Sequence, residues 1–147
     1  MNAAVEAVSV VVELDPAMKT DRLASAILEY PGCQAIFTCS TQLVPYQRMQ
    51  FFGEKGRVEV EIPFNAPPDR PSRILIDNGA DLFGGGIRRE EIPVCDQYTI
   101  QGDEFSKAVL GERSVPVPLE DSIRNMAVIE AIFRSAQSGR RETVEEL

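Results

Sequence analysis

The chain has 147 residues, of which 44% are hydrophobic, and this is enough for one ordinary domain with a continuous core. Its 15 basic residues are scattered among 23 acidic ones, and the net charge of -8 excludes the basic stripe that a nucleic-acid surface needs. No run approaches the roughly 20 apolar residues of a membrane-spanning helix. We therefore expect neither a nucleic acid nor a membrane as partner.

The cysteines indicate the compartment. Cys33, Cys39 and Cys95 have no paired spacing and form no Cys-x-x-Cys motif, so neither a disulfide framework nor a metal site is predicted. Unpaired cysteines are typical of a reducing compartment. The N-terminus also lacks a basic region followed by an apolar one. We therefore expect a cytoplasmic protein.

The first part of the chain alternates between apolar and polar residues, which is the pattern of half-buried strands. Residues 5–14 form the first predicted strand, which begins so early that we expect another segment to precede this domain. Residues 22–30 and 34–43 are predicted to form a hairpin around Pro31-Gly32. Proline presets φ in such a turn, and glycine accepts the left-handed position.

A second hairpin is predicted from Gln47 to Ile62. Three apolar residues alternate with three charged ones over residues 57–62, so one side of this strand is directed to the core. The Gly53-Glu54-Lys55-Gly56 segment can supply the positive φ of a tight turn. An anion-binding loop is the alternative, but no helix follows whose N-terminal amides would complete such a site. A charged hairpin turn is therefore favoured.

The middle of the chain is predicted to be irregular, with two short strands. Residues 63–71 are proline-rich and predict an extended loop. Residues 73–77 and 87–92 are the predicted strands. The Gly84-Gly85-Gly86 run between them is interpreted as a flexible turn, because the GxGxxG spacing of a dinucleotide-binding fingerprint is absent.

From Asp96 onward the apolar period becomes that of a helix. Asp96 is a good N-cap, and Gly111 stands where a C-terminal cap belongs. A longer helix is predicted from Leu119 to Gly139, and the tail from Glu142 to Leu147 is expected to fray. The apolar stripe of the longer helix comprises Leu119, Ile123, Met126, Ile129, Ile132, Phe133 and Ala136.

Strands joined by hairpin-length connections and followed by two helices are typical of the α+β class. We predict a single domain over residues 1–147, with an open, mostly antiparallel β-sheet and two C-terminal helices packed on one face. The other face also carries apolar side chains, which makes it a candidate surface for homo-oligomerisation or for docking of another domain. These residues are Ala7, Val11, Ala24, Ala26 and Leu28.

A polar row alternates with apolar residues along the third predicted strand, at Thr38, Ser40 and Gln42. Two interpretations are open. The row lines a ligand, or this side of the sheet meets water or a partner subunit, and the second interpretation is favoured.

The side-chain inventory limits the chemistry that this chain can perform. It contains no histidine, so a histidine triad or a histidine metal cluster is excluded. The acid pair Glu90-Glu91 is expected at a turn. The pair Glu120-Asp121 is expected in the first turn of the last helix, where the helix dipole accounts for it. No catalytic residue is predicted.

Three segments together resemble the C-terminal half of the Gfo/Idh/MocA family, the relatives of glucose-fructose oxidoreductase and inositol dehydrogenase. They are the run from Thr20 to Pro71 with its FFGEKGRVEVEIPF hairpin, the DQYTIQGDEFSKAV helix and the PLEDSIRNMAVIEAIFRSAQSG helix. The resemblance extends from about Val5 to Arg141.

In that family an N-terminal Rossmann domain binds NAD or NADP, and the C-terminal domain helps to form the substrate pocket and mediates oligomerisation. The resemblance implies that this chain is the substrate-side and oligomerisation domain of an NAD(P)-dependent sugar or polyol dehydrogenase. The family's Glu-Lys-Pro motif, with its catalytic lysine, is absent, since Glu54-Lys55 is followed by Gly56. We therefore expect a Rossmann domain as partner, in cis or in trans, and no cofactor binding or activity by this chain alone.

The resemblance also implies where substrate lies. Gln97, Tyr98 and Gln101 are the main candidates, because helix N-termini border the clefts of this family, and Arg70 and Arg73 are further candidates. A structural role of Tyr98, as an apolar anchor with a solvated hydroxyl, is an equal alternative. The competing function is a free-standing, non-catalytic binding or dimerisation module that uses the same scaffold.

Overall fold

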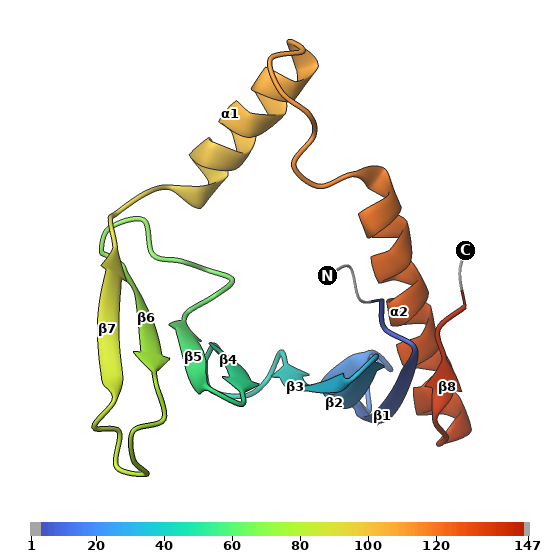
Figure 1. Ribbon diagram of the computed structural model, residues 1–147. Helices are drawn as coiled ribbons and strands as arrows, with labels where there is room; N and C mark the ends of the chain where they lie inside the picture. The colour runs from blue at the N-terminus through green and yellow to red at the C-terminus, as the bar shows by residue number, and fades with distance from the viewer. Residues whose placement is uncertain (1–3, 146–147) are drawn as a thin grey trace. The chain divides into compact units, whose positions relative to one another are not determined.

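The computed structural model describes residues 4–145 (Figure 1). The chain divides into two compact units: the described residues of Met1–Val44 and Pro116–Leu147 form the first, and Pro45–Val115 the second. Within the described range, each unit contains one antiparallel sheet of four strands and one helix. The predicted α+β class and the antiparallel pairing are confirmed. The strands nevertheless form two sheets, where the sequence suggested one.

The first sheet has the strand order β3-β2-β1-β8. As predicted, β1 (Ala7–Leu14), β2 (Asp21–Tyr30) and β3 (Cys33–Ser40) follow one another through hairpin connections. β8 (Glu142–Thr143) pairs with the start of β1. The predicted fraying is therefore wrong for residues 142–143, because β1 offers them backbone partners. Residues 146–147 lie outside the described range.

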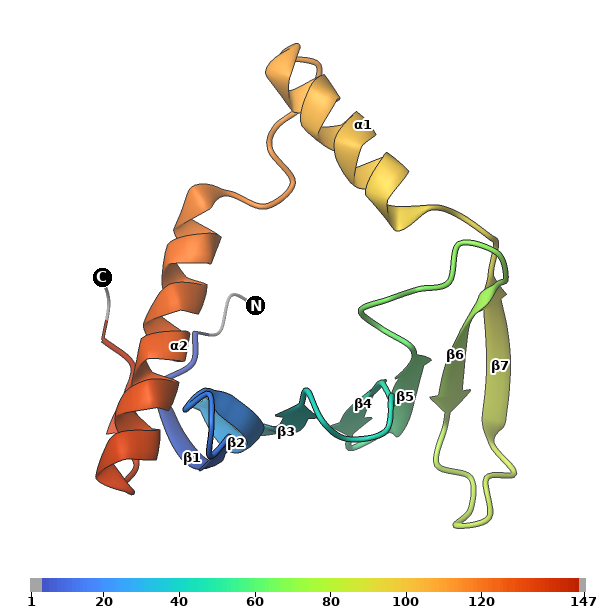
Figure 2. The same cartoon turned by 180° about the vertical axis from the view of Figure 1, so that it is seen from behind.

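α2 (Leu119–Ser138) lies along β1 and β8 of the first sheet, and Figure 2 shows the same arrangement from behind. Its buried surface consists of three small side chains one turn apart, Ala127, Ala131 and Ser135, each at most 4% exposed. Leu119 and Phe133 of the predicted stripe are 71% and 50% exposed. The predicted stripe is thus only partly correct: Ile129, Ile132 and Ala136 are half-buried, but the most deeply buried positions are small side chains, which allow the helix backbone to approach the strand closely.

The register of β1 against β2 decides which side chains share a face. Val10 lies opposite Ala26, and Val12 lies opposite Ala24, so each pair projects to the same side. Ala24 and Ala26 are buried, and Leu28 follows them at the same period. The prediction that these three residues belong to the open face is therefore wrong. Alternation within one strand does not reveal how neighbouring strands are matched.

The second sheet has the strand order β4-β5-β6-β7. Its strands are β4 (Arg48–Gly53), β5 (Gly56–Glu61), β6 (Ser72–Asp77) and β7 (Ile87–Ile92). The predicted central hairpin is β4-β5. Its turn requires glycine at Gly56, because φ is +151° there and a Cβ would lie 2.2 Å from the carbonyl oxygen of Asp77. Glu90 and Glu91 lie within β7 and not at a turn, since β7 continues through Ile92.

α1 (Gln97–Val109) belongs to the second unit and begins where the sequence predicts. The Asp96 carboxylate accepts a hydrogen bond from the backbone N–H of Tyr98 at 2.9 Å, which is the expected N-cap. No residue of α1 is buried, and Phe105 and Val109 are each 70% exposed. Neither helix of the described range is long and apolar enough to span a membrane.

Candidate functional site

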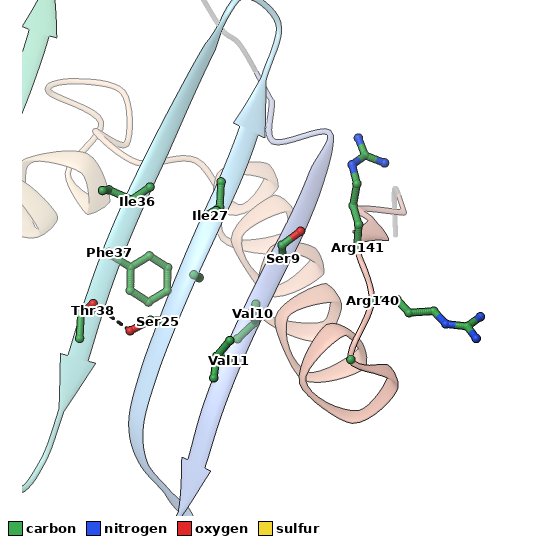
Figure 3. A pocket seen from close by; sticks show the side chains of 12 residues that line it. Ser9, Val10, Val11, Ser25, Ile27, Ile36, Phe37, Thr38, Arg140 and Arg141 are labelled. Carbon is green, nitrogen blue, oxygen red and sulfur yellow. Dashed lines mark hydrogen bonds between the residues drawn. The ribbon is translucent and has the colours of Figure 1, made fainter.

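The exposed face of the first sheet forms a shallow hollow of about 750 Å³ across β1, β2 and β3 (Figure 3). Alternate residues of the three strands line it, because side chains two positions apart share a face. The segment from Gly139 to Arg141, which follows α2, forms one side. The floor of the hollow comprises Ser9, Val11, Ser25, Ile27, Ile36 and Thr38.

One half of this floor is aliphatic. Ile27 lies directly opposite Ile36 in the ladder between β2 and β3. Val11 and Ile36 are 77% and 79% exposed, and Ile27 is 43% exposed. Three β-branched side chains that are so open to solvent on one face form an apolar patch of the kind that proteins use for contacts.

The other half of the floor is made of hydroxyl groups. The hydroxyls of Ser25 and Thr38, which lie opposite each other, are 2.9 Å apart and hydrogen-bonded. Of the predicted polar row, only Thr38 reaches the hollow. The Ser40 hydroxyl donates to a backbone carbonyl of β2 at 2.6 Å, and the Gln42 amide donates to the Asp15 carboxylate at 3.1 Å. The polar row therefore does not act as one surface.

A pair of charged residues borders the hollow. Arg141 donates two parallel hydrogen bonds to the Glu29 carboxylate, at 2.8 Å and 2.7 Å. This bidentate contact lowers the pKa of Glu29 and raises that of Arg141. The Arg140 side chain extends outward beside it and forms no ion pair with any residue in the range 4–145 (Figure 3). One of the two guanidinium groups at the rim is thus available.

The hollow is suited to contact and not to chemistry. No carboxylate, lysine or cysteine is among the residues that line it, so it holds no general acid or base that could activate its serine and threonine hydroxyls as nucleophiles. In the described part of the chain, no group of three or more acidic or cysteine side chains is arranged to hold a metal ion. What the hollow offers is aliphatic area, three hydroxyls and a basic rim.

Three of the predicted substrate-side residues lie on the first turns of α1 in the second unit. The Gln97 side-chain amide donates a hydrogen bond to the carbonyl oxygen of Phe64 at 3.3 Å. This contact ties the start of the helix to the proline-rich loop. Tyr98 is 67% exposed and Gln101 is exposed, and neither side chain is hydrogen-bonded to another described residue.

Sequence reasoning missed Gln47, which organises the same loop. Its side-chain oxygen accepts hydrogen bonds from the backbone N–H groups of Phe64 and Asn65, both at 3.2 Å, and its amide donates to the Asn65 side chain at 2.5 Å. The chain enters this loop through Ile62, whose φ of +51° is rare for a β-branched residue. No local signal pointed to Gln47, because its partners lie 17 and 18 positions away.

The two predicted arginines are already paired with carboxylates. Arg70 binds the neighbouring Asp69 through two hydrogen bonds at 3.0 Å and 2.9 Å, and Arg73 forms an ion pair with Glu61 of β5. Among the described residues, no hydrogen bond or ion pair links either arginine to α1. The structure thus joins Gln97 to the proline-rich loop, but it brings neither arginine into contact with Gln97, Tyr98 or Gln101 through a hydrogen bond or ion pair of the described residues.

Arg73 belongs to a network of charges on one face of the second sheet. Arg48 bridges Glu59 and Glu61 at 3.2 Å and 3.3 Å, and Arg57 binds Asp77 at 3.0 Å. Two hydrogen bonds lower the pKa of Asp77. The larger effect comes from the backbone N–H of Gly79, and the smaller from the Arg57 side chain. Each of the six charges named for this network has a partner of opposite sign.

Comparison with known sequences identifies relatives along nearly the whole chain. Residues 3–145 match the profile described as the oxidoreductase family, C-terminal alpha/beta domain. The uncharacterized oxidoreductase ORF334 of Rhizobium meliloti is 39% identical over 140 residues, which cover 95% of this chain and 42% of that protein.

Solved structures of oxidoreductases share the fold of this chain along most of its length. The aldose-aldose oxidoreductase of Caulobacter crescentus, solved with glycerol, is 25% identical with a TM-score of 0.77, over 96% of this chain and 42% of that one. The 3-ketoreductase KijD10 of Actinomadura kijaniata, solved with TDP-benzene and NADP, is 20% identical with a TM-score of 0.79, over 92% of this chain and 42% of that one. This chain spans less than half the length of these relatives.

Proposed function

Because this chain belongs to the Gfo/Idh/MocA oxidoreductase family and matches its C-terminal α/β domain over residues 3–145, we propose that it is the substrate-side and oligomerisation domain of an NAD(P)-dependent sugar or polyol dehydrogenase. The match over nearly the whole chain is the observation that carries the proposal. The Caulobacter crescentus relative supports a polyhydroxylated substrate, since it is an aldose-aldose oxidoreductase solved with glycerol.

The proposal divides the reaction between two parts of an enzyme. This chain spans 42% of its curated relative, and we assign the cofactor and the catalytic lysine to a Rossmann domain that acts in cis or in trans. A dinucleotide bound there would supply the hydride acceptor for oxidation of a substrate alcohol. KijD10, a protein of the same fold, was solved with NADP, which agrees with this division. The role of the present chain is to bind and orient the substrate.

We place the substrate near the start of α1. Tyr98 and Gln101 present an exposed phenol and an exposed amide, which can donate to and accept from sugar hydroxyls. Gln97 fixes the helix to the proline-rich loop and so positions them. Arg70 and Arg73 are weaker candidates for substrate binding, because each would have to break an ion pair with a carboxylate to reach a ligand.

We assign the oligomerisation to the hollow of the first sheet. Its aliphatic floor is open to solvent at Val11 and Ile36, and covering such a patch stabilises an assembly through the hydrophobic effect. Light scattering at micromolar concentration should detect a dimer or a larger species, and a monomer would contradict this assignment. The three free, exposed cysteines support a reducing compartment, and we place the protein in the cytoplasm.

A chimaera tests the substrate role. The present chain replaces the corresponding part of the Rhizobium meliloti relative, and turnover of NAD or NADP is measured with a panel of aldoses and polyols. We expect activity with at least one of them, and a KM that rises about tenfold or more in the Gln101→Ala variant because a hydrogen bond to substrate is lost. Gln137→Ala, at an exposed position of α2, is the matched control. A chimaera that folds and binds NADP but oxidises no sugar contradicts the proposal.

The second candidate function is a free-standing binding or dimerisation module. It is favoured by the absence of the Glu-Lys-Pro motif and of histidine from the sequence. The genomic sequence upstream of the Met1 codon discriminates between the two. An in-frame segment encoding a Rossmann domain supports the dehydrogenase, whereas a stop codon in frame followed by a ribosome-binding site supports the module.

A further inference from the structure

Phe64, in the proline-rich loop of the second unit, is held by a glutamine on each side of its backbone. Its N–H donates to the side-chain oxygen of Gln47 at 3.2 Å, and its carbonyl oxygen accepts from the side-chain amide of Gln97 at 3.3 Å. Gln47 directly precedes β4, and Gln97 is the first residue of α1. Phe64 therefore links the entrance of the second sheet to the helix start at which we place the substrate.

The loop leaves β5 in a conformation that needs such support. The φ of +51° at Ile62 is strained for a β-branched residue, and strained backbone persists only where the surrounding contacts hold it. The oxygen of Gln47 accepts the N–H groups of both Phe64 and Asn65, and its amide donates to the Asn65 side chain at 2.5 Å. Two successive N–H groups that converge on one oxygen define the path of the backbone at Phe64.

The aromatic ring of Phe64 stays open to solvent in this arrangement, with 64% of the residue exposed. Single exposed apolar residues are common, but here the backbone that carries the ring is fixed from both sides. A ring on a fixed backbone loses little conformational entropy when it binds a ligand. Phe64 is thus a preformed apolar contact group beside the start of α1.

A sugar or polyol presents two kinds of surface to a protein. Its hydroxyls need hydrogen-bond partners, which Tyr98 and Gln101 offer, and its C–H groups form an apolar face that packs against an aromatic ring. Small-molecule sites combine apolar and aromatic lining with a few polar groups that fix orientation. The residues assigned so far supply the polar half of such a site, and Phe64 supplies the apolar half.

We propose that Phe64 is a further substrate-binding residue, whose ring packs against the C–H face of the substrate, and that Gln47 is the residue that positions it. The inference rests on the proposed function and extends the same site. It also narrows the substrate class to aldoses or polyols that present contiguous C–H groups on one face.

Variants of Phe64 in the chimaera described above test the contact. Phe64→Ala should raise the KM of the best substrate of the panel about tenfold and change kcat less than about twofold, because uniform binding is lost. Phe64→Tyr keeps the ring and should keep the KM within about twofold, whereas Phe64→Leu, which is apolar but not aromatic, should raise it about fivefold. Phe83→Ala, at a position that is 99% exposed, is the matched control and should leave both constants unchanged.

Variants of Gln47 test the positioning role. Gln47→Ala should raise the KM about as much as Phe64→Ala, and Gln47→Glu, which keeps an acceptor oxygen, should restore most of the affinity. Because Gln47 acts through Phe64, adding Gln47→Ala to Phe64→Ala should raise the KM less than about twofold further. Gln50→Ala is the matched control, since the Gln50 amide binds the Glu59 carboxylate at 2.8 Å and not the loop.

Hydrogen exchange of the present chain gives a second measurement that does not depend on turnover. The backbone amides of Phe64 and Asn65 should exchange faster in Gln47→Ala than in the wild-type chain, because both lose their acceptor. They should exchange at the wild-type rate in Gln50→Ala. Unchanged exchange in Gln47→Ala would overturn the positioning by Gln47.

The outcomes separate this inference from the proposed function beneath it. A KM that rises in Gln101→Ala but not in Phe64→Ala overturns the apolar contact and leaves the substrate-side role of the chain in place. Equal KM values for Phe64→Leu and Phe64→Tyr show that the ring makes no specific contact, and fully additive effects of Gln47→Ala and Phe64→Ala show that Gln47 does not act through Phe64. A chimaera that folds and binds NADP but oxidises no sugar overturns both proposals.

Discussion

Ser135 connects three parts of the first unit through one hydroxyl group. The side chain, which is 1% exposed, accepts a hydrogen bond from the backbone N–H of Val10 at 3.1 Å and donates one to the carbonyl oxygen of Arg140 at 2.6 Å. It thereby links α2 to β1 and to the segment that leads into β8. Few other side chains of this chain are buried so completely.

We expect Ser135→Ala to lower the free energy of unfolding by about 1–3 kcal/mol, because a buried donor and a buried acceptor lose their partner. Urea unfolding monitored by circular dichroism measures this change. Ser122→Ala is the control, since it makes the same substitution at an exposed position of α2 and should change stability little. A loss of the same size in both variants would show that the hydrogen bonds of Ser135 are not its cause.

Asp81 makes the conformation of the connection between β6 and β7 depend on pH, because its carboxylate accepts hydrogen bonds from the backbone N–H groups of Phe83 and Gly85. The backbone hydrogen bonds from Gly85 and Phe83 lower the pKa of its carboxyl group. A group whose pKa is lowered by folding stabilises the fold above its unfolded pKa, about 3.9 for aspartate. That stabilisation is lost as the pH falls through the lowered folded pKa.

The amides of Phe83 and Gly85 should therefore resist hydrogen exchange at neutral pH and exchange faster in Asp81→Ala. Their NMR shifts should move together when the pH falls below about 3.9. The control is Asp103→Ala, an exposed acidic position on α1. If exchange of these two amides does not respond to loss of the Asp81 carboxylate, this group does not fix the connection between β6 and β7.

The sequence predicts residues whose partners are close along the chain. Asp96 could be identified as an N-cap because the N–H that it binds is only two positions away. Gln47 binds groups 17 and 18 positions away, and Ser135 binds Val10, which is 125 positions away. A glutamine or a serine does not indicate by its residue type which distant group it will bind, so the roles of these two residues follow only from the folded structure.

At the scale of elements, α2 shows how a helix can dock through small residues. Ala131 is fully buried between Ala127 and Ser135, which leaves no room for a longer side chain. We expect Ala131→Leu to destabilise the chain by about 1–3 kcal/mol, because overpacking forces the helix away from β1. Thermal or urea unfolding gives the value. Gln137→Leu adds a similar side chain on the exposed side of α2, and a cost as large as that of Ala131→Leu would contradict this account.

The positions of the hairpins and helices follow from the sequence, because turn residues and caps act locally. The β4-β5 hairpin forms around Gly56, and α2 ends at Gly139, whose left-handed φ of +65° ends the helix as predicted. The way in which one element packs against another cannot be inferred from the sequence in the same manner. Ala24 and Ala26 were assigned to the wrong face because register is a property of two strands. The predicted stripe of α2 omitted the buried Ala127, Ala131 and Ser135 because large apolar side chains were taken as the sign of burial.

At the scale of the whole molecule, we expect no dinucleotide binding by this chain alone. The Gly84-Gly85-Gly86 run leads into β7 and not into a helix, so no helix N-terminus receives a pyrophosphate there. The net charge of -8 also repels phosphates.

Calorimetry with NAD, NADH, NADP and NADPH should therefore give no saturable heat with this chain alone. The Rhizobium meliloti relative at the same concentration serves as the positive control, since it is an oxidoreductase more than twice as long as the segment matched here. Saturable binding to the present chain in the micromolar range would overturn the assignment of the cofactor to another domain.

The division of the chain has a consequence for biosynthesis. The second unit is one uninterrupted stretch inserted between the two portions of the first. During translation the inserted stretch is therefore complete while β1, β2 and β3 still await α2 and β8, which are synthesised after it. The nascent first sheet must survive that interval with its small alanines uncovered. We infer that the closing step, in which Ser135 meets Val10, comes late and is where a chaperone would help most.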